Sequence, residues 1–280
     1  MELTEEPLLS EAEVSDLLET LHTHFGYDFT SYTVSSVKRR LRRFMSTNRL
    51  GSVAELKSKM LSHQNLSAEL IRDISVTVTE MFRDPSFYLY LRQVISRRLA
   101  TYPLIKIWVA GCATGEEAYS LAILLKEEGL LDRCLLYATD INQHSIDAAR
   151  NGIYPIASMK LYTSNYLASG GKVPFSQYYH AMYGSVLLDA SLKERIVFST
   201  HNLVSDSAFN EFQLISCRNV LIYFNPFLQN RVLSLFYESL CSFGFLCLGN
   251  KESLLFSDQK RFFEEQNRKE RVFMKSENLH

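Results

Sequence analysis

The stretch from residue 105 to 152 constrains the fold more than any other part of the chain, because its hydrophobic period changes from strand to helix and back. "IKIWVA" predicts a strand, "GEEAYSLAILLKEEG" a helix, "CLLYATD" a second strand and "NQHSIDAARNG" a second helix. Strands and helices that alternate in this way form βαβ units. The sequence therefore predicts an α/β domain with a parallel sheet and helices on its faces.

The later part of the chain supplies further predicted strands. We expect "FQLISCRNVLIYF" to be strand sequence split by its polar centre, "FGFLCLGN" to follow the helix "PFLQNRVLSLFYESL", and "RVFMKS" to form a last, edge strand. Between residue 154 and about residue 200 the βα rhythm breaks. There "SVLLDASLKERIVFS" predicts a strand, a turn or bulge and another strand, inserted into the α/β domain.

The first part of the chain has a helical pattern instead. "EAEVSDLLETLHTHF" and "TSYTVSSVKRRLRRFM" each place apolar residues on one helical face, and "SVAELKSKML" begins with Ser52 and Glu55 at capping-box spacing. Asp84 and Pro85 then resemble an N-cap followed by proline at the first helical position, which predicts a helix to about Leu99. We expect a helical domain over 1–76, a linker and helix over 77–102, and an α/β domain over 103–280 with a β-subdomain inserted at about 157–200.

Composition excludes several classes of protein. A formal net charge of -1 argues against a chain that coats nucleic acid. The five cysteines have no CxxC spacing and the histidines no metal-ligand spacing, so we expect reduced, buried thiols and no metal. The start "MELTEEPLLSEAE" lacks the basic and apolar regions of a signal peptide, and no apolar run reaches the roughly 18 residues of a membrane helix. These features predict a cytoplasmic protein.

The glycine turn "GCATGEEAYS" joins the first predicted strand to its helix. Glycines at 111 and 115 allow the backbone to turn tightly and to approach a ligand at the carboxyl end of the strand. The spacing differs from G-x-G-x-x-G, which disfavours NAD. Glu116 and Glu117 stand where a pyrophosphate would bind, so a cationic or uncharged nucleoside fits better. The alternative is a turn without a ligand, whose glutamates complement the helix dipole.

Other polar residues stand at or inside predicted strands. Asp140 ends the second strand, where nucleotide-binding α/β folds place an acid on ribose hydroxyls, although such an Asp can also cap a helix. Arg218 and Asn219 interrupt an apolar strand, and a buried polar pair needs partners. The pair either hydrogen-bonds loops across the sheet or holds a ligand. Asn202 ends a strand and can hydrogen-bond an adenine edge, or it serves structure alone.

A basic run lies on the second predicted helix. Its sequence is "KRRLRR", and its basic residues are Lys38, Arg39, Arg40, Arg42 and Arg43. The opposite face of this helix is apolar. The run is a solvated helix face, a nucleic-acid contact or a contact for an acidic protein surface. The usual catalytic signatures G-x-S-x-G, H-E-x-x-H and G-x-x-x-x-G-K-[ST] do not occur.

Seven strings, in their order along residues 76–255, resemble the chemotaxis receptor methyltransferases, the CheR-type protein-glutamate O-methyltransferases. They are "TEMFRD", "GCATGEEAYSLA", "ATDIN", "GIYP", "THNL", "CRNVLIYF" and "LCLGNKESL". The resemblance implies a Rossmann-like S-adenosylmethionine-dependent methyltransferase sheet, an N-terminal all-helical domain and a small inserted antiparallel β-subdomain. It implies S-adenosylmethionine as donor, S-adenosylhomocysteine as product, and glutamates on the cytoplasmic helices of methyl-accepting chemoreceptors as acceptors.

The resemblance also assigns residues. The residues that it places around the donor are Thr77, Thr79, Arg83, Gly111, Glu117, Asp140, Asn202, Leu203, Arg218 and Asn219. Tyr223 is expected near the transferred methyl group, and Arg83 either holds the donor carboxylate or orients the acceptor glutamate. The basic helix is expected to face the receptor. The segment between Tyr179 and Leu187 is shorter than in members that dock on a tethering peptide of the receptor, so tethering stays open.

Two other functions compete with this interpretation. A non-catalytic module that senses S-adenosylmethionine would have a damaged transfer site, yet Arg83, Asn219 and Tyr223 are present. A nucleic-acid methyltransferase would suit the basic helix, but no aromatic stacking platform accompanies it. We therefore expect an enzyme that acts as a monomer, binds no nucleic acid and meets the membrane only through the receptor.

Overall fold

The computed structural model describes residues 9–75, 79–255 and 257–276. Its contacts divide the chain into two compact units. The helical unit comprises residues 1–77 together with Tyr223–Gln229, and the sheet unit comprises Val78–Ile222 and residues 230–280.

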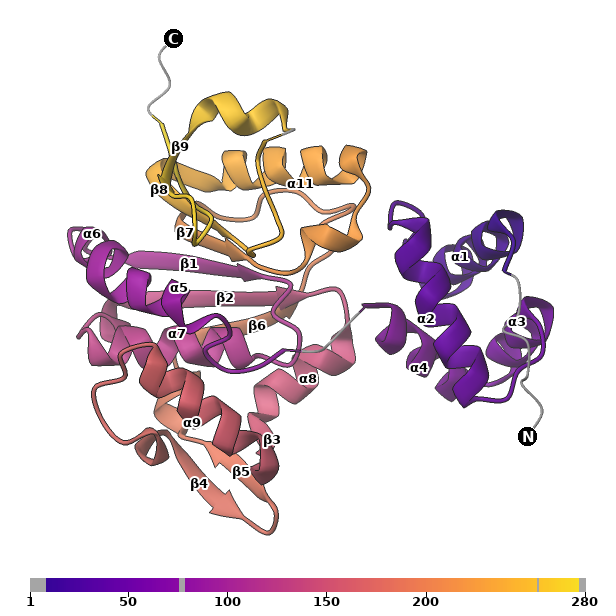
Figure 1. Ribbon diagram of the computed structural model, residues 1–280, viewed down its shortest axis with the longest axis horizontal. Helices are drawn as coiled ribbons and strands as arrows, with labels where there is room; N and C mark the ends of the chain where they lie inside the picture. Colours follow the sequence, from indigo (N-terminus) through magenta and orange to yellow (C-terminus); the bar gives the residue numbers. More distant parts are fainter. Residues whose placement is uncertain (1–8, 76–78, 256, 277–280) are drawn as a thin grey trace. The chain divides into compact units, whose positions relative to one another are not determined.

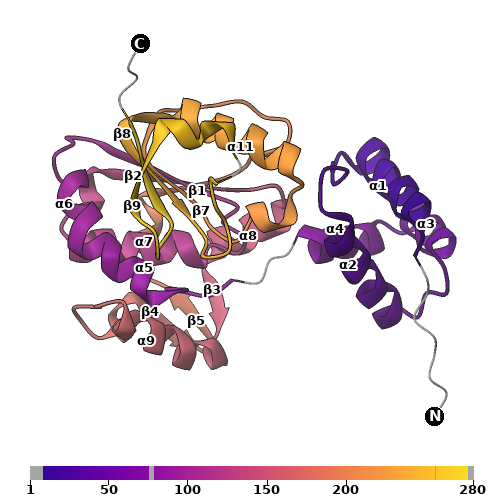
Figure 2. The ribbon, with the colours of Figure 1, turned by 45° about the horizontal axis from the view of Figure 1, so that its top comes forward.

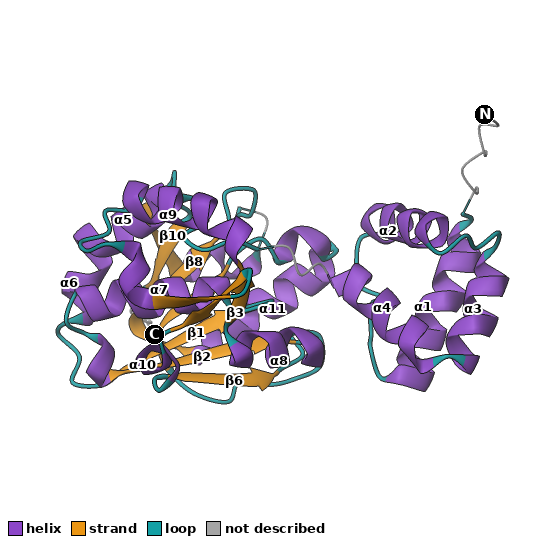
Figure 3. Ribbon diagram, turned by 90° about the horizontal axis from the view of Figure 1, so that it is seen from below, coloured by secondary structure: helices purple, strands orange, loops and turns teal. Residues whose placement is uncertain are grey.

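The helical unit is built on α1 (Glu11–Phe25), α2 (Val34–Thr47), α3 (Val53–Ser62) and α4 (Gln64–Ser75), and Figure 3 shows these as helices joined by loops. Ser10 begins α1 with a capping box to Glu13, and Gly26 ends it in the left-handed conformation. On α3 the side chain of Ser52 accepts from the N–H of Glu55, which is one half of the predicted capping box, and the Glu55 carboxylate accepts from the N–H of Gly51. The apolar stripes of these helices face one another, and their central leucines, Leu17, Leu21, Leu41, Leu56 and Leu70, are fully buried.

The sheet unit opens with one continuous helical segment, as the sequence predicts up to Leu99. It consists of α5 (Pro85–Tyr90), a π-helical turn (Leu91–Ile95) and α6 (Ser96–Leu99). The strands are β1 (Ile105–Ala110), β2 (Cys134–Asp140), β3 (Ile153–Pro155), β4 (Tyr179–Met182), β5 (Ser185–Leu188), β6 (Ile196–Thr200), β7 (Phe212–Cys217), β8 (Leu240–Leu248), β9 (Phe263–Asn267) and β10 (Val272–Lys275). The helices between them are α7 (Glu116–Glu127), α8 (Gln143–Asn151), α9 (Met159–Ala168), α10 (Ala190–Lys193) and α11 (Pro226–Ser239).

The main sheet has the strand order β6-β2-β1-β7-β8-β10-β9. Pairing is parallel from β6 to β8, and β10 runs antiparallel to both of its neighbours. The chain moves outward from β1 to β2 and β6, then returns to β7 on the other side of β1. The strand order therefore reverses between β1 and β7, which is where open α/β sheets bind ligands.

The two faces of β1 pack against different helices. Ile107 and Val109 belong to the buried cluster that contains the apolar face of α7. Trp108 points to the opposite face and lies 5.3 Å, ring centre to ring centre, from Phe236 of α11. Figure 1 shows α11 on one side of the sheet and α5 and α7 on the other. Because both faces are covered, β1 is apolar along almost its whole length.

A second, three-stranded antiparallel sheet has the order β3-β5-β4. Figure 2 shows it beside α9, set apart from the main sheet. A tight turn joins β4 to β5 through Tyr183 and Gly184, both with positive φ. This sheet confirms the predicted antiparallel β-subdomain, and the main sheet confirms the predicted methyltransferase-like α/β fold.

The structure corrects three of the predicted strands. Only the first half of "SVLLDASLKERIVFS" joins the small sheet, because α10 follows β5 and β6 then pairs in parallel with β2. The sequence after Cys217 is not a strand, because Asn219 has a φ of 62° and Leu221–Tyr223 forms a 3-10 turn. "RVFMKS" forms an interior strand, and the edge is the more polar β9.

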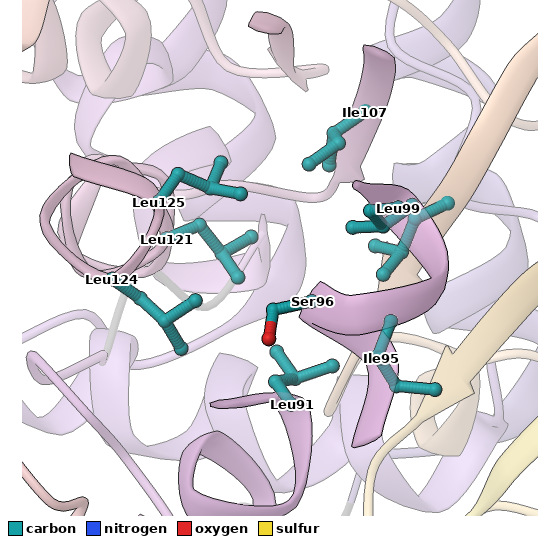
Figure 4. Close-up of a pocket in the computed structure, with 9 residues that line it drawn as sticks. Leu91, Ile95, Ser96, Leu99, Ile107, Leu121, Leu124 and Leu125 are labelled. Atoms are coloured by element: carbon teal, nitrogen blue, oxygen red, sulfur yellow. The ribbon is translucent and has the colours of Figure 1, made fainter. Parts of the chain in front are cut away.

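One small cavity lies in the core of the sheet unit. It measures about 10 Å³ and is lined by Leu91, Ile95, Ser96, Leu99, Ile107, Leu121, Leu124, Leu125 and Leu214 (Figure 4). The hydroxyl of Ser96 already donates to the carbonyl of Arg92 at 2.5 Å. A space of this size holds at most about one water molecule, so it is a packing gap and not a substrate site.

None of the helices in the described part of the chain combines the length and the apolar character that crossing a membrane requires.

Candidate functional site

The glycine turn after β1 requires its glycines. Gly111 and Gly115 have φ angles of 75° and 96°. A Cβ on Gly115 would lie 2.8 Å from the Cβ of Ala149, and one on Gly111 would lie 2.5 Å from a methyl group of Val220. The turn is therefore packed tightly on both sides, and a larger residue at either position would push it out of place.

Asp140 ties this turn to the end of β2. Its side chain accepts hydrogen bonds from the N–H groups of Ala113 and Asn142, each at 2.9 Å. The cap of α8 is Asn142 and not Asp140, so the helix-capping alternative is wrong. Burial raises the pKa of Asp140, against the lowering effect of the N–H groups. Each carboxylate oxygen can accept a second hydrogen bond, which leaves acceptor capacity for ligand hydroxyls.

Arg218 is the centre of a buried ionic cluster at the end of β7. Its side chain is 1% exposed and lies 2.7 Å from the carboxylate of Asp84 and 3.5 Å from that of Glu117. It donates to the carbonyl of Arg83, and its guanidinium lies 4.0 Å from the ring centre of Phe87. Burial lowers the pKa of Arg218, but the neighbouring carboxylates more than offset this and the pKa is raised.

These contacts fit the first of the two alternatives for Arg218, a residue that hydrogen-bonds loops across the sheet. Its Nε atom nevertheless has no hydrogen-bond partner among the described residues. A buried donor of this kind is uncommon. The cluster therefore keeps one unused hydrogen-bonding position.

The segment around Arg83 has a strained backbone. Phe82 and Asp84, on either side of it, have φ angles of 52° and 58°. The N–H of Phe82 donates to the hydroxyl of Ser120 on α7 at 2.9 Å, which fixes the segment against that helix. Such strained residues gather at functional sites. The Asp84 side chain does not cap α5, contrary to the prediction, because it pairs with Arg218 instead.

The two glutamates at the start of α7 have different environments. Glu117 accepts from the hydroxyl of Ser216 on β7 at 2.5 Å and faces Arg218. Glu116 is buried, accepts from Thr114 at 2.7 Å, and has a raised pKa because of burial. Asp84 and Ser216 were missed by sequence reasoning, since one resembled a helix cap and the other a small residue in an apolar strand.

The predicted adenine contacts follow β6. The N–H of His201 donates to the carbonyl of Asp140 at 3.1 Å, which places this loop next to the end of β2. The side-chain oxygen of Asn202 accepts from the N–H of Val204, so it shapes its own loop. Leu203 is buried. The structure thus brings Arg83, Gly111, Glu117, Asp140, Asn202, Leu203, Arg218 and Asn219 to the ends of neighbouring strands, through contacts within the sheet unit.

The predicted site also includes Thr77, Thr79 and Tyr223. Thr77 is outside the described residues, and Thr79 is partly buried. Tyr223 belongs to the helical unit, where its carbonyl accepts from the N–H of Thr33 at 2.8 Å. Arg40 is also in the helical unit and is 6% exposed, and its guanidinium lies 4.5 Å from the Tyr223 ring centre.

Burial removes Arg40 from the basic surface that the sequence predicted. Its guanidinium donates to the carbonyl of Ile74, inside the helical unit. Arg39 and Arg43 are exposed, and Arg43 pairs with Asp73 at 3.1 Å. Lys38 and Arg42 are half-buried. The exposed basic surface of α2 therefore consists of Arg39 and Arg43, flanked by Lys38 and Arg42.

The charges of the sheet-unit site match a cationic nucleoside. Three carboxylates, Glu116, Glu117 and Asp140, lie around the glycine turn, and the guanidinium of Arg218 forms an ion pair with Glu117. Among the described residues, no group of three or more His, Cys, Asp and Glu side chains is placed to hold a metal ion. A positively charged sulfonium with ribose hydroxyls fits this set of acceptors.

Comparison with known proteins identifies both parts of the chain. The family model for the CheR methyltransferase, SAM binding domain, matches residues 77–271, and that for the CheR methyltransferase, all-alpha domain, matches residues 12–75. The chain is 46% identical to "Putative methyltransferase Cher3" of Pseudomonas putida, with 95% of this chain and 98% of that protein covered. It is 29% identical to "Chemotaxis protein methyltransferase 1" of Vibrio cholerae, over 88% of this chain and 90% of that protein.

The SAM-binding model alone covers well over half of the chain, and the acidic site fits the donor that this model names. This confirms S-adenosylmethionine as the predicted cofactor. The chain belongs to the CheR methyltransferase family.

Proposed function

We propose that the chain transfers the methyl group of S-adenosylmethionine to glutamate side chains in the cytoplasmic domains of methyl-accepting chemoreceptors. The observation that carries the proposal is the match of both domains, in one chain, to a family whose relatives include chemotaxis protein methyltransferases. The products are glutamate methyl esters, which serve chemotactic adaptation or a related receptor pathway.

Methyl transfer to a carboxylate requires little acid or base catalysis from the protein. When bound, S-adenosylmethionine supplies a methyl group on a positively charged sulfur. The acceptor glutamate has a reference pKa of about 4.3 and is already ionised at neutral pH, so no general base is needed. The residues of this chain therefore have to bind, orient and exclude water. Tightly packed turns such as those at Arg83 and Gly111 suit that task.

The roles proposed for single residues come from the family resemblance, and the contacts of Asp140 and Glu117 support theirs. Asp140 accepts from the ribose hydroxyls, and Glu117 provides negative charge close to the donor. Arg83 binds a carboxylate, either that of the donor or that of the acceptor, because a guanidinium fits both. Tyr223 orients the methyl group or the acceptor through its ring and hydroxyl and removes no proton.

We further propose that the exposed basic surface of α2 meets the acidic face of the receptor helices. Arg39 and Arg43 are the residues best placed for this contact, since both are exposed. Arg40 is left out, because its guanidinium is already used inside the helical unit.

The test is transfer of a labelled methyl group to membranes that contain a chemoreceptor, with receptor-free membranes as the control. We expect label on the receptor that mild base releases, because methyl esters are base-labile. Base-stable label, or label on added nucleic acid, would contradict the glutamate assignment. Binding of S-adenosylhomocysteine without any transfer would favour the sensing module.

The basic surface is tested in the same assay with R39E/R43E. We expect transfer to the receptor to slow about tenfold, while affinity for S-adenosylhomocysteine stays unchanged, since long-range charge attraction speeds encounter. The double variant R268E/K269E reverses two exposed charges near β10 and is the matched control. Equal rates for the two double variants would reject the docking role.

A further inference from the structure

Glu252, in the loop after β8, has an unusual set of partners. It is 3% exposed, and its carboxylate accepts hydrogen bonds from four backbone N–H groups. The donors and their distances are Gly249 at 2.6 Å, Val220 at 2.8 Å, Asn219 at 3.0 Å and Ile222 at 3.3 Å. Three of these donors come from one turn, residues 219–222. These four main-chain N–H groups form a cage around the Glu252 carboxylate, and such a set of donors favours an anion.

The caged turn lies between parts of the candidate site. Asn219 directly follows Arg218 and has the left-handed φ of 62°, which is unfavourable for a residue other than glycine. A methyl group of Val220 packs against Gly111 so closely that a Cβ there would lie 2.5 Å away. Ile222 directly precedes Tyr223 in the chain. A shift of this turn would therefore move Arg218 and release the packing against the glycine turn.

Gly249, which directly follows β8, supplies the fourth N–H group of the cage. A Cβ at this position would lie 2.8 Å from the backbone nitrogen of Asn219 and 2.8 Å from the carboxylate of Glu252. The absence of a side chain at Gly249 is thus required for the carboxylate to reach the turn. The string "LGNKES" places Gly249 and Glu252 together, but it carries no sign of the turn that they hold.

We propose that Glu252 is a positioning residue for methyl transfer, whose carboxylate holds the 219–222 turn in the conformation that presents Arg218 and Asn219 to the donor. The proposal rests on the proposed function, since it concerns the same site. The competing view gives Glu252 a role in stability alone.

The variant E252Q separates the two views. Glutamine has the shape of glutamate, but its terminal NH2 group replaces one of the two carboxylate oxygens. An NH2 group cannot accept hydrogen bonds, so some of the backbone N–H groups would lose their acceptor. Leaving such buried donors unsatisfied costs enough to displace the turn. E127Q is the matched control, because Glu127 is a buried carboxylate that accepts from Tyr178 and Lys172 outside the site.

The primary readout is hydrogen exchange of the peptide that contains residues 219–222, with affinity for S-adenosylhomocysteine by calorimetry. For E252Q we expect exchange to speed up about tenfold or more and affinity to fall roughly tenfold. For E127Q we expect a lower Tm with wild-type exchange in this peptide and wild-type affinity. Wild-type exchange or wild-type affinity in folded E252Q would overturn the proposal.

G249A provides a second route if E252Q does not fold. It leaves the carboxylate in place and displaces the turn by steric overlap, so the same two changes are expected, and wild-type behaviour would count against the proposal. Neither readout uses a receptor. If E252Q loses affinity while the wild-type protein transfers no methyl group to receptor, the Glu252 role is supported and the proposed acceptor is rejected.

Discussion

Two buried arginines in the sheet unit have the same kind of ionic partners. Arg218 lies between Asp84 and Glu117, at 2.7 and 3.5 Å, and Arg92 lies between Glu127 and Glu128, at 2.5 and 3.2 Å. The two arginine side chains are 1% and 5% exposed. By charge and burial alone the clusters are nearly equivalent.

The two clusters differ in the exposure of their carboxylates and in the further hydrogen bonds that their members make. Glu127 is 3% exposed and also accepts from Tyr166, from Tyr178 at 3.0 Å and from the N–H of Lys172 at 3.1 Å. The Nε of Arg92 donates to the carbonyl of Ser169 at 3.0 Å. In contrast, Asp84 is 31% and Glu117 14% exposed, and the Nε of Arg218 has no partner among the described residues.

The difference shows that a buried ion pair does not by itself reveal its purpose. In the Arg92 cluster the two buried atoms without a hydrogen bond, Nη2 of Arg92 and Oε2 of Glu127, form an ion pair with each other at 2.5 Å. A cluster paired internally in this way is suited to holding elements together. An open cluster keeps acceptors and a donor for something that is not part of the chain. We therefore propose that the Arg92 cluster serves the fold and that the Arg218 cluster serves the donor site.

The largest effect is expected from R218M compared with R92M. Each variant removes a buried cation from between two carboxylates, which should cost about 3–5 kcal/mol of unfolding free energy. R218M should in addition weaken binding of S-adenosylhomocysteine about 100-fold, whereas R92M should leave it within about twofold. Urea unfolding and calorimetry measure the two quantities. If the two variants bind S-adenosylhomocysteine with equal affinity, the different roles proposed for the two clusters are wrong.

Asp140 sharpens the comparison, because it is buried like Glu127 but is held by N–H groups and not by an arginine. D140N places an NH2 group against these donors and should weaken S-adenosylhomocysteine binding by about 10- to 100-fold. D189N is the control, since Asp189 caps α10 and asparagine caps equally well. The ribose assignment fails if calorimetry finds wild-type affinity for D140N.

A smaller effect is expected from E117Q compared with E128Q. The two glutamates have similar exposure, 14% and 17%, and each pairs with a buried arginine. E117Q should reduce affinity for S-adenosylhomocysteine about tenfold, because it removes negative charge next to the proposed donor position, while E128Q should leave affinity unchanged. A reduction by both variants would mean that the Arg92 cluster also supports the donor site.

The smallest expected effect is on the pH dependence of stability. Burial raises the pKa of Glu127, but its hydrogen bonds and Arg92 more than offset this, so the folded-state pKa is lowered. Its contribution to stability is therefore present above the unfolded pKa and is lost as the pH falls through the folded pKa. The Tm deficit of E127Q should be several degrees at pH 7 and should shrink below about pH 4.

Glu116 should show the opposite sign, because burial raises its folded-state pKa. Its stabilising contribution is present below the unfolded pKa and is lost as the pH rises through the folded pKa. The Tm of E116Q, relative to that of the wild-type protein, should therefore be higher at pH 7 than at pH 4. Thermal unfolding of both variants across this range measures the contrast, and parallel pH profiles for E116Q and E127Q would contradict it.

The sequence by itself determined the alternating strands and helices of residues 105–152, the glycine turn and the position of Asp140 at a strand end. Each of these depends on residues that are close in the chain: a hydrophobic period, a cap, or a glycine between a strand and a helix. The string resemblance added the methyltransferase family and its donor. The antiparallel β-subdomain was also predictable, although the part of "SVLLDASLKERIVFS" that forms β6 was assigned to the wrong sheet.

Only the tertiary structure decided which partner each polar group has. Arg218 and Asp84 are 134 residues apart, and Glu252 reaches Asn219 across 33 residues, distances over which a local pattern carries no information. The basic run of α2 showed five cations, but the helical turn directs Arg40 inward and Arg39 and Arg43 outward. The physical reason is that periodicity reports which face of an element is buried, whereas a buried charge is placed by the partner that the rest of the fold brings to it.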